Sequence, residues 1–154
     1  MNHSNNALEI DQNAPVTASG EIEITANRED VWEIMSDIER WTDWNPDITE
    51  VEINGAVEPG TEFRWKSGPG MIRSTLRTVS PPETIAWTGK TMGISAVHVW
   101  HLEQTEHGTV VRTEESWDGL IAKILKGLSR KMLQKAIDSG LDYLKSAAEN
   151  SKHR

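Results

Sequence analysis

The feature that most constrains the fold is a change in hydrophobic periodicity near Leu120. Before this residue, short segments alternate apolar and polar side chains, which is typical of strands with one buried face. After it, apolar side chains recur every three or four residues as far as about Ala148, which is typical of an amphipathic helix. The chain therefore divides into a region of strands and one long terminal helix.

The alternating segments follow one another closely and are separated by turn-forming pairs such as Asn54-Gly55 and His107-Gly108. Short connections of this kind join antiparallel neighbours. After a first strand that alternates from Glu21, we expect six more strands, over residues 48–53, 61–66, 71–79, 84–89, 94–104 and 109–117.

A short helix is expected between the first two strands. Asn27 is a suitable N-cap, Asp30 falls in the first turn, and apolar residues follow at helical spacing through Ile38. Pro46 excludes a continuing helix at the preceding residue. This element order predicts an α+β fold, in which one curved antiparallel sheet of about seven strands wraps around the C-terminal helix.

Length and composition indicate one domain without disulfides. A chain of 154 residues can bury about two-thirds of its unfolded surface, and it contains no cysteine. We expect a single domain over residues 18–150, with order beginning near Ser19, after a flexible polar tail over residues 1–17. Neither a leader segment nor an apolar run of membrane-spanning length is recognisable, so we expect a cytoplasmic protein with no integral membrane association.

The net charge of −8, with acidic and basic residues interleaved, argues against nucleic acid as a partner. One basic cluster falls on the predicted terminal helix. We interpret it as a solvated helix face in preference to a docking site for an anionic membrane or a protein partner. Its members are Lys123, Lys126, Arg130, Lys131 and Lys135.

Several segments resemble a known family. A helix start at residues 26–32 (ANREDVW) is followed by residues 41–46 (WTDWNP), 81–83 (PPE), 96–102 (AVHVWHL) and 108–115 (GTVVRTEE). In this order they resemble the START-like or SRPBCC superfamily, with its polyketide cyclase/dehydrase and lipid-transport members, over about residues 19–148. The resemblance implies a helix-grip fold with a deep, mostly apolar cavity between sheet and C-terminal helix. It implies little about chemistry, because members include both carriers and cyclases.

Strand alternation places an imidazole and a carboxylate on the inner face of the predicted sheet, at His98 and Glu115. If Gln104 lies opposite Thr109, counting back along both strands pairs His98 directly with Glu115. A two-residue turn would instead put Trp100 opposite Glu115 and His98 one diagonal away. Both registers keep the two side chains inside.

This pair has more than one interpretation. A buried carboxylate costs several kcal/mol unless it is paired, so His98 and Glu115 are expected to satisfy each other in a purely structural role or to orient a polar group of a ligand. Proton transfer is a third, less favoured interpretation, which makes these two residues the catalytic candidates.

Seven tryptophans against one tyrosine and one phenylalanine supply aromatic surface to nearly every predicted element, and each can fill a core or wall a ligand. Alternation also assigns Ile72, Ser74, Thr78 and Ile85 to the inner face. Residues expected to contact a ligand are Phe63, Trp65, Leu76, Trp87, His98, Trp100, Thr113, Glu115, Leu128 and Met132. Residues expected at the cavity mouth are Trp41, Trp44 and Met92, although the two tryptophans more often anchor a loop.

No cofactor or metal is expected. His98 and His101 would point to opposite faces of a strand, and cysteine ligands are lacking. Residues 68–70 (GPG) lack the spacing of a dinucleotide-binding loop.

We therefore expect a protein that binds a hydrophobic or aromatic small molecule, lipid- or polyketide-like, as a monomer or homodimer. One alternative is a cyclase- or dehydratase-like enzyme that uses Glu115 or His98 as a general acid or base. The other is a protein-interaction module that docks through its long helix.

Overall fold

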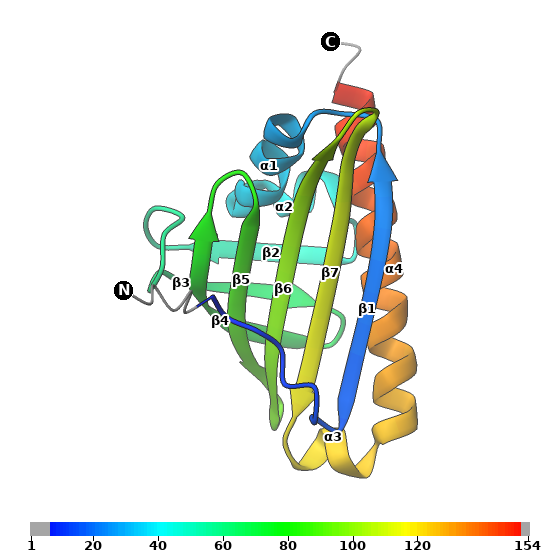
Figure 1. Cartoon of the computed structure of the whole chain (residues 1–154). Helices are drawn as coiled ribbons and strands as arrows, with labels where there is room; N and C mark the ends of the chain where they lie inside the picture. Colours follow the sequence, from blue (N-terminus) through cyan, green and yellow to red (C-terminus); the bar gives the residue numbers. More distant parts are fainter. Residues whose placement is uncertain (1–6, 152–154) are drawn as a thin grey trace, which may run out of the picture.

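The computed structural model describes residues 7–151, and one antiparallel sheet organises them (Figure 1). Its order is β1-β7-β6-β5-β4-β3-β2, so the first and last strands in sequence are neighbours. The strands are β1 (Val16–Ile24), β2 (Ile48–Ile53), β3 (Glu62–Ser67), β4 (Gly70–Ser80), β5 (Thr84–Thr91), β6 (Ile94–Thr105) and β7 (Gly108–Asp118).

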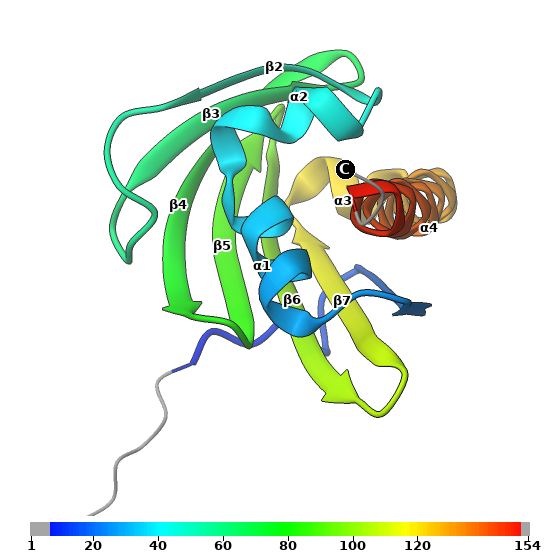
Figure 2. The same cartoon turned by 90° about the horizontal axis from the view of Figure 1, so that it is seen from above.

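Helical segments connect β1 to β2 and follow β7. They are α1 (Arg28–Ser36), the 3₁₀ turn η1 (Ile38–Arg40), α2 (Trp41–Trp44), α3 (Leu120–Ile124) and α4 (Lys126–Ser151). Asn27 caps α1 as expected, because its side chain accepts a hydrogen bond from the Asp30 N–H at 2.9 Å. Figure 2 shows the sheet curving from β1 round to β2 with α4 on its concave side. The predicted α+β helix-grip architecture is confirmed.

Helix α4 lies against β1, the edge strand of the sheet. Gly20 permits the close approach, since a Cβ at this position would lie 2.7 Å from Leu141 Cδ1. Side chains of α4 also donate hydrogen bonds to backbone carbonyls of β1. Gln134 Nε2 donates to the Ser19 carbonyl at 3.0 Å, and Lys145 Nζ donates to the Glu23 carbonyl at 2.7 Å. The helix therefore covers a strand edge that would otherwise be open to pairing.

The far end of α4 is tied to the end of β1 by Glu149. Its carboxylate accepts a hydrogen bond from the Thr25 N–H at 2.9 Å and pairs with Lys145 at 3.3 Å. The bond from Thr25 is the main cause that lowers the pKa of Glu149 below its ordinary value. Together with the contacts of Gln134 and Lys145, it fixes α4 along the whole length of the strand.

One inner-face assignment is wrong. A bulge between Leu76 and Thr78 puts Thr78 opposite Ala86, so the side chains of β4 change faces there. Thr78 accepts a hydrogen bond from the Leu8 N–H on the outer face, and Val79 takes the inward position. An extra residue in a strand inverts every later assignment made by alternation.

The ordered chain begins earlier than expected. Residues 1–6 lie outside the described residues, but β1 starts at Val16, and the preceding segment crosses the outer face of β6 and β7 (Figure 1). The Asp11 N–H donates to Ser116 Oγ at 3.2 Å, and Ile10 is buried. The expectation of a flexible tail through residue 17 is thus wrong from Leu8 onward, because Leu8 and Ile10 cover the sheet without forming a repeating pattern.

The terminal helical region is not continuous. Leu125 leaves helical geometry (φ −106°, ψ 42°) and separates α3 from α4, near Gly127, which is a poor helix former. Burial in α4 begins at Ser129 and Leu133, whereas most apolar side chains before them are exposed. Within residues 7–151, no helix is both long and apolar enough to cross a bilayer.

Gly20→Val tests the close packing of α4 on β1. The added side chain would clash with Leu141 and Ile137, so we expect a loss of about 1–3 kcal/mol in the free energy of unfolding, measured by urea denaturation. Ser19→Val, at the exposed neighbouring position, is the control and should change stability by less than about 0.5 kcal/mol. Equal effects of the two substitutions would contradict the packing argument.

Candidate functional site

The β6–β7 hairpin fixes the candidate site. Gln104 lies opposite Thr109, and counting back places Trp100 opposite Thr113 and His98 opposite Glu115. This is the first of the two registers considered from the sequence. Because the inward residues of β6 alternate with outward ones, the imidazole and the carboxylate meet on the concave face of the sheet.

His98 and Glu115 form a close, nearly buried pair. Nδ1 of His98 lies 2.6 Å from Oε1 of Glu115, and the two side chains are 11% and 12% exposed. The Trp117 indole N–H donates to the other oxygen, Oε2. Nδ1 lies close to the Glu115 carboxyl group, but Oε1 is off the direction of the ring N–H. The two atoms therefore make no aligned hydrogen bond. Oε2 is thus hydrogen-bonded, while Oε1 and Nδ1 face each other without an aligned hydrogen bond.

Thr113 sets the tautomer of His98. Its hydroxyl donates to the Val99 carbonyl at 3.0 Å and lies 2.8 Å from Nε2 of His98. A hydroxyl has one proton to donate, so Nε2 must carry its own proton and donate to Thr113. Nδ1 is thereby left facing Oε1 of Glu115 at 2.6 Å. The site therefore holds an imidazole and a carboxyl group side by side.

Aromatic rings surround this polar pair on one side. The imidazole of His98 lies 4.9 Å from the ring of Trp87 and 5.3 Å from that of Trp100. The ring of Trp87 in turn lies 5.2 Å from the ring of Trp41 and 5.8 Å from that of Phe63. Such tilted and edge-to-face contacts favour a rigid arrangement. Aromatic side chains thus fill the interior on the far side of His98.

The aromatic cluster corrects one expectation. Trp41 was expected at a cavity mouth, but it is 2% exposed, contacts Trp65 at 5.5 Å and donates to the Met35 carbonyl at 2.9 Å. It is a central core residue, because η1 and α2 fold inward over the sheet. Trp65, at the edge of the cluster, donates to Ser74 Oγ at 3.0 Å, and Leu76 is completely buried.

Trp100 differs from Trp41 and Trp65 in the state of its indole N–H. Within residues 7–151, its indole Nε1 is buried and has no hydrogen-bond partner, whereas Trp41 and Trp65 each have one. A buried, unpaired N–H is uncommon in folded proteins and costs about 1–3 kcal/mol. Because Trp100 neighbours His98, this donor adds to the polar groups of the candidate site.

The inner face opens toward α3. Along β6, Leu102 is 1% exposed and His98 8%, while Ala96 and Ile94 are only half-buried. Leu128 and Met132 lie on the side of α4 away from its buried residues Leu133 and Ile137, and are 58% and 50% exposed. They do not form the enclosed ligand wall that we expected. Met92, an expected mouth residue, is 62% exposed in the β5–β6 turn at this open end.

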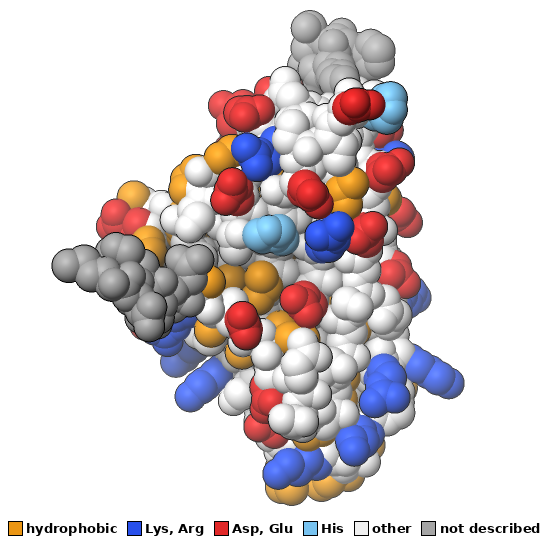
Figure 3. All heavy atoms as spheres, viewed as in Figure 1, with side chains coloured by type: hydrophobic (Ala, Val, Ile, Leu, Met, Phe, Trp, Pro, Cys, Tyr) orange, Lys and Arg blue, Asp and Glu red, His pale blue; other side chains and the backbone are white. Residues whose placement is uncertain are grey.

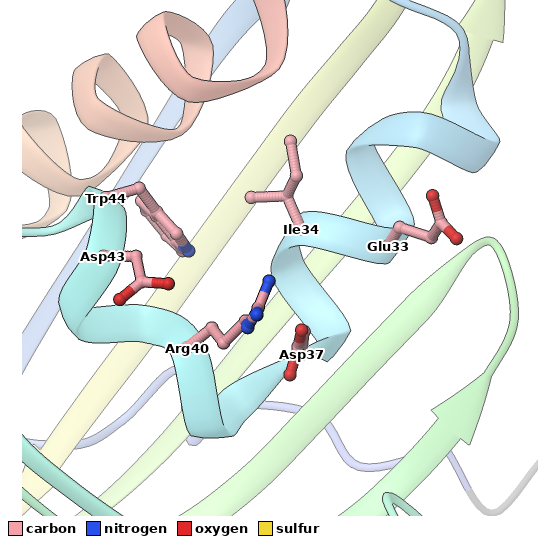
Figure 4. A pocket seen from close by; sticks show the side chains of 6 residues that line it. All are labelled: Glu33, Ile34, Asp37, Arg40, Asp43 and Trp44. Carbon is pink, nitrogen blue, oxygen red and sulfur yellow. The ribbon is translucent and has the colours of Figure 1, made fainter. Parts of the chain in front are cut away.

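A separate hollow of about 370 Å³ lies over α1, η1 and α2 (Figure 4). Trp44, the remaining expected mouth residue, lines it rather than the space near His98, and its Nε1 is buried without a partner among the described residues. The other lining residues are Glu33, Ile34, Asp37, Arg40 and Asp43. Three carboxylates make this hollow more polar than the surroundings of His98.

Sequence reasoning missed Trp117 as a member of the polar network. It lies two residues after Glu115 and therefore on the same face of β7, which was the available signal. Within residues 7–151, no three histidine, cysteine, aspartate or glutamate side chains are grouped as they would be around a metal ion.

Residues 15–149 match the family described as polyketide cyclase / dehydrase and lipid transport. The chain belongs to this family. It is accordingly a member of the START-like, or SRPBCC, superfamily, as the sequence motifs suggested. No curated protein sequence matches it.

Solved structures similar to this family member share its fold at low sequence identity. The hypothetical protein jhp0584 from Helicobacter pylori is 18% identical, with a TM-score of 0.77 over 90% of this chain and 91% of that one. A START superfamily protein from Mycobacterium smegmatis is 14% identical, with a TM-score of 0.70 over 87% and 97%. The di-domain ARO/CYC StfQ of the steffimycin biosynthetic pathway is 15% identical, with a TM-score of 0.73 over 90% of this chain and 52% of that one.

Thr113→Val tests the polar network of this family member. The substitution keeps the shape of the side chain but leaves His98 Nε2 and the Val99 carbonyl without their partner, so we expect a loss of about 1–3 kcal/mol in unfolding free energy. Urea denaturation measures it. Thr88→Val, on the half-buried outer face of β5, is the matched control and should cost less than about 1 kcal/mol.

Proposed function

We propose that this protein binds a hydrophobic small molecule with an aromatic or otherwise planar, polyketide-like ring system, on the concave face of the sheet beside His98. The observation that carries the proposal is the buried His98–Glu115 pair next to the unpartnered Nε1 of Trp100. Polar groups of this kind, in an otherwise apolar and aromatic surrounding, are the usual means by which a pocket orients a largely apolar ligand.

The proposed ligand would need both ring surface and an oxygen. Trp87, His98 and Trp100 present tilted rings, against which a planar molecule can stack. A carbonyl or hydroxyl oxygen of the ligand would accept from Trp100 Nε1, the buried indole nitrogen without a partner. A saturated hydrocarbon chain would leave this N–H unsatisfied, so a ring system with oxygen substituents is favoured.

The open end of the inner face supplies the entry route in this proposal. Half-buried Ile94 and Ala96, followed by Trp117, lead from the α3 end to Glu115. The aromatic cluster around Trp41 and Trp87 closes the opposite end. Similarity to the ARO/CYC protein StfQ is consistent with a polyketide-like ligand class, although the shared property is the fold.

Tryptophan fluorescence tests the proposed binding. Titration with a panel of flavonoids, polyketide-like aromatics and fatty acids should give saturable quenching with an aromatic class and none with fatty acids. Trp100→Phe keeps the ring but removes the N–H donor, so the dissociation constant should rise by about 2–10-fold. Trp32→Phe, a half-buried position on α1, is the control and should bind as the unmodified chain does. The proposal fails if no aromatic class saturates.

A second candidate function is catalysis by the same pair. The contact between His98 Nδ1 and Glu115 Oε1 places two groups able to transfer a proton within reach of one ligand, as a cyclase- or dehydratase-like step next to a substrate carbonyl requires. The norcoclaurine synthase from Thalictrum flavum, which is 15% identical with a TM-score of 0.70 over 88% of this chain and 95% of that one, is an enzyme with this fold.

Glu115→Gln separates catalysis from binding. The amide preserves size and still accepts from Trp117, so ligand affinity should stay within about threefold while turnover falls by about 10²–10⁴-fold, the usual contribution of a general acid or base. Substrate depletion is followed by chromatography, and affinity by fluorescence. Parallel loss of affinity and turnover would count against a proton-transfer role and leave Glu115 as a binding residue.

A further inference from the structure

An exposed apolar surface lies at the α3 end of the molecule. Eight large hydrophobic side chains are exposed within the described residues, and seven of them gather here, Met71 on the outer face of the sheet being the exception. We call this group the apolar elbow: Met92, Leu120, Ile121, Ile124, Leu125, Leu128 and Met132. Its most exposed members are Leu120 at 68% and Ile124 at 66%. Exposed apolar side chains that gather in this way mark interaction surfaces.

The elbow is one surface built from two segments. Gly119 has φ +110°, and a Cβ there would lie 2.2 Å from the Gly93 carbonyl oxygen, so the start of α3 packs directly on the β5–β6 turn. Ile121 lies against Gly93 in the same way. The turn that carries Met92 therefore adjoins α3, and the Met92 side chain itself lies beside Gly70 at the start of β4.

Met92 occupies a backbone position that does not favour it. It has φ +42° and precedes Gly93 with φ +76°, the geometry of a two-residue hairpin turn in which asparagine or aspartate is usual at the first position. A strained backbone conformation and an exposed apolar side chain both oppose methionine here. Its contact with Gly70 leaves the side chain 62% exposed, so an apolar contact outside the chain would help to account for the residue.

The elbow is also basic, in an acidic protein. Residues 119–137 contain no aspartate or glutamate, but they hold Lys123, Lys126, Arg130, Lys131 and Lys135, while the whole chain has a net charge of −8. Figure 3 shows Lys and Arg side chains around apolar ones at the lower end of the molecule, where Figure 1 places α3. The basic residues that the sequence suggested to be a solvated helix face thus surround an apolar surface.

We propose that the apolar elbow docks on an anionic lipid bilayer. Apolar side chains flanked by lysine and arginine are the combination that binds the interface of such a membrane. The acidic remainder of the chain would be repelled from the anionic surface, so the molecule would bind with the apolar elbow facing the membrane. A second copy of the chain fits less well. A two-fold symmetric contact would set the basic residues against each other, and no other large apolar patch is exposed on the described residues.

Vesicle flotation with the full chain tests this proposal. Vesicles of phosphatidylcholine mixed with phosphatidylserine should bind the protein, and more weakly as salt rises, while vesicles of phosphatidylcholine alone should bind it poorly. Lys126→Glu with Arg130→Glu should weaken binding to the mixed vesicles at least fivefold. Ile124→Ser with Leu128→Ser should weaken it about tenfold or more.

Matched controls are available on the outer face of the sheet. Met71→Ser removes an exposed apolar side chain there, and Arg73→Glu reverses an exposed charge. Both should bind vesicles as the unmodified chain does.

Absence of binding to mixed vesicles, or equal binding by elbow and control variants, would overturn the proposal. Concentration-dependent self-association that Ile124→Ser abolishes, without vesicle binding, would overturn it in favour of a second copy. Because vesicle binding and the fluorescence titration are independent, this proposal can fail while the ligand site stands.

Discussion

The antiparallel register of β6 and β7 is the constraint on which the candidate site depends. It sets His98 opposite Glu115 and Trp100 opposite Thr113. A shift of one residue would turn one of these strands over and send its polar residues to the outer face. The turn at Gly108, where a Cβ would lie 2.1 Å from the Ile24 carbonyl oxygen, also joins the hairpin to the end of β1. The site and the packing of the sheet edge are therefore fixed together.

Around His98, some buried polar groups have hydrogen-bond partners and one does not. Thr113 and Val99 satisfy one side of the imidazole, and Trp117 satisfies one oxygen of Glu115. Trp100 Nε1 is left without a partner, although hydrophobic packing alone could have placed a phenylalanine there. A core selected only for stability would avoid this unpaired donor. This imbalance distinguishes the surroundings of His98 from the rest of the aromatic cluster.

Alternation and turn chemistry predicted the strands, the capped α1 and the common inner face of His98 and Glu115, with their direct pairing as one of two registers, because each depends on residues close in sequence or on counting from one turn. Three features depended on long-range packing and could not be read in this way. The bulge after Leu76 moved Thr78 to the outer face. The inward fold of α2 buried Trp41. At Leu128 and Met132, the apolar pattern suggested an inner position, but the break at Leu125 and the packing of Leu133 on the sheet leave both side chains exposed.

Strand geometry gives the distance between His98 and the open end of the inner face. His98 lies four residues beyond Ile94, the first residue of β6 after the Met92–Gly93 turn. At about 3.3 Å per residue, the imidazole lies roughly 13 Å from that rim. The packed rings of Trp87 and Trp41 lie on the other side of His98. If the proposed ligand enters from this end, it must therefore extend about 13 Å along β6, roughly the length of three fused six-membered rings, to reach the imidazole.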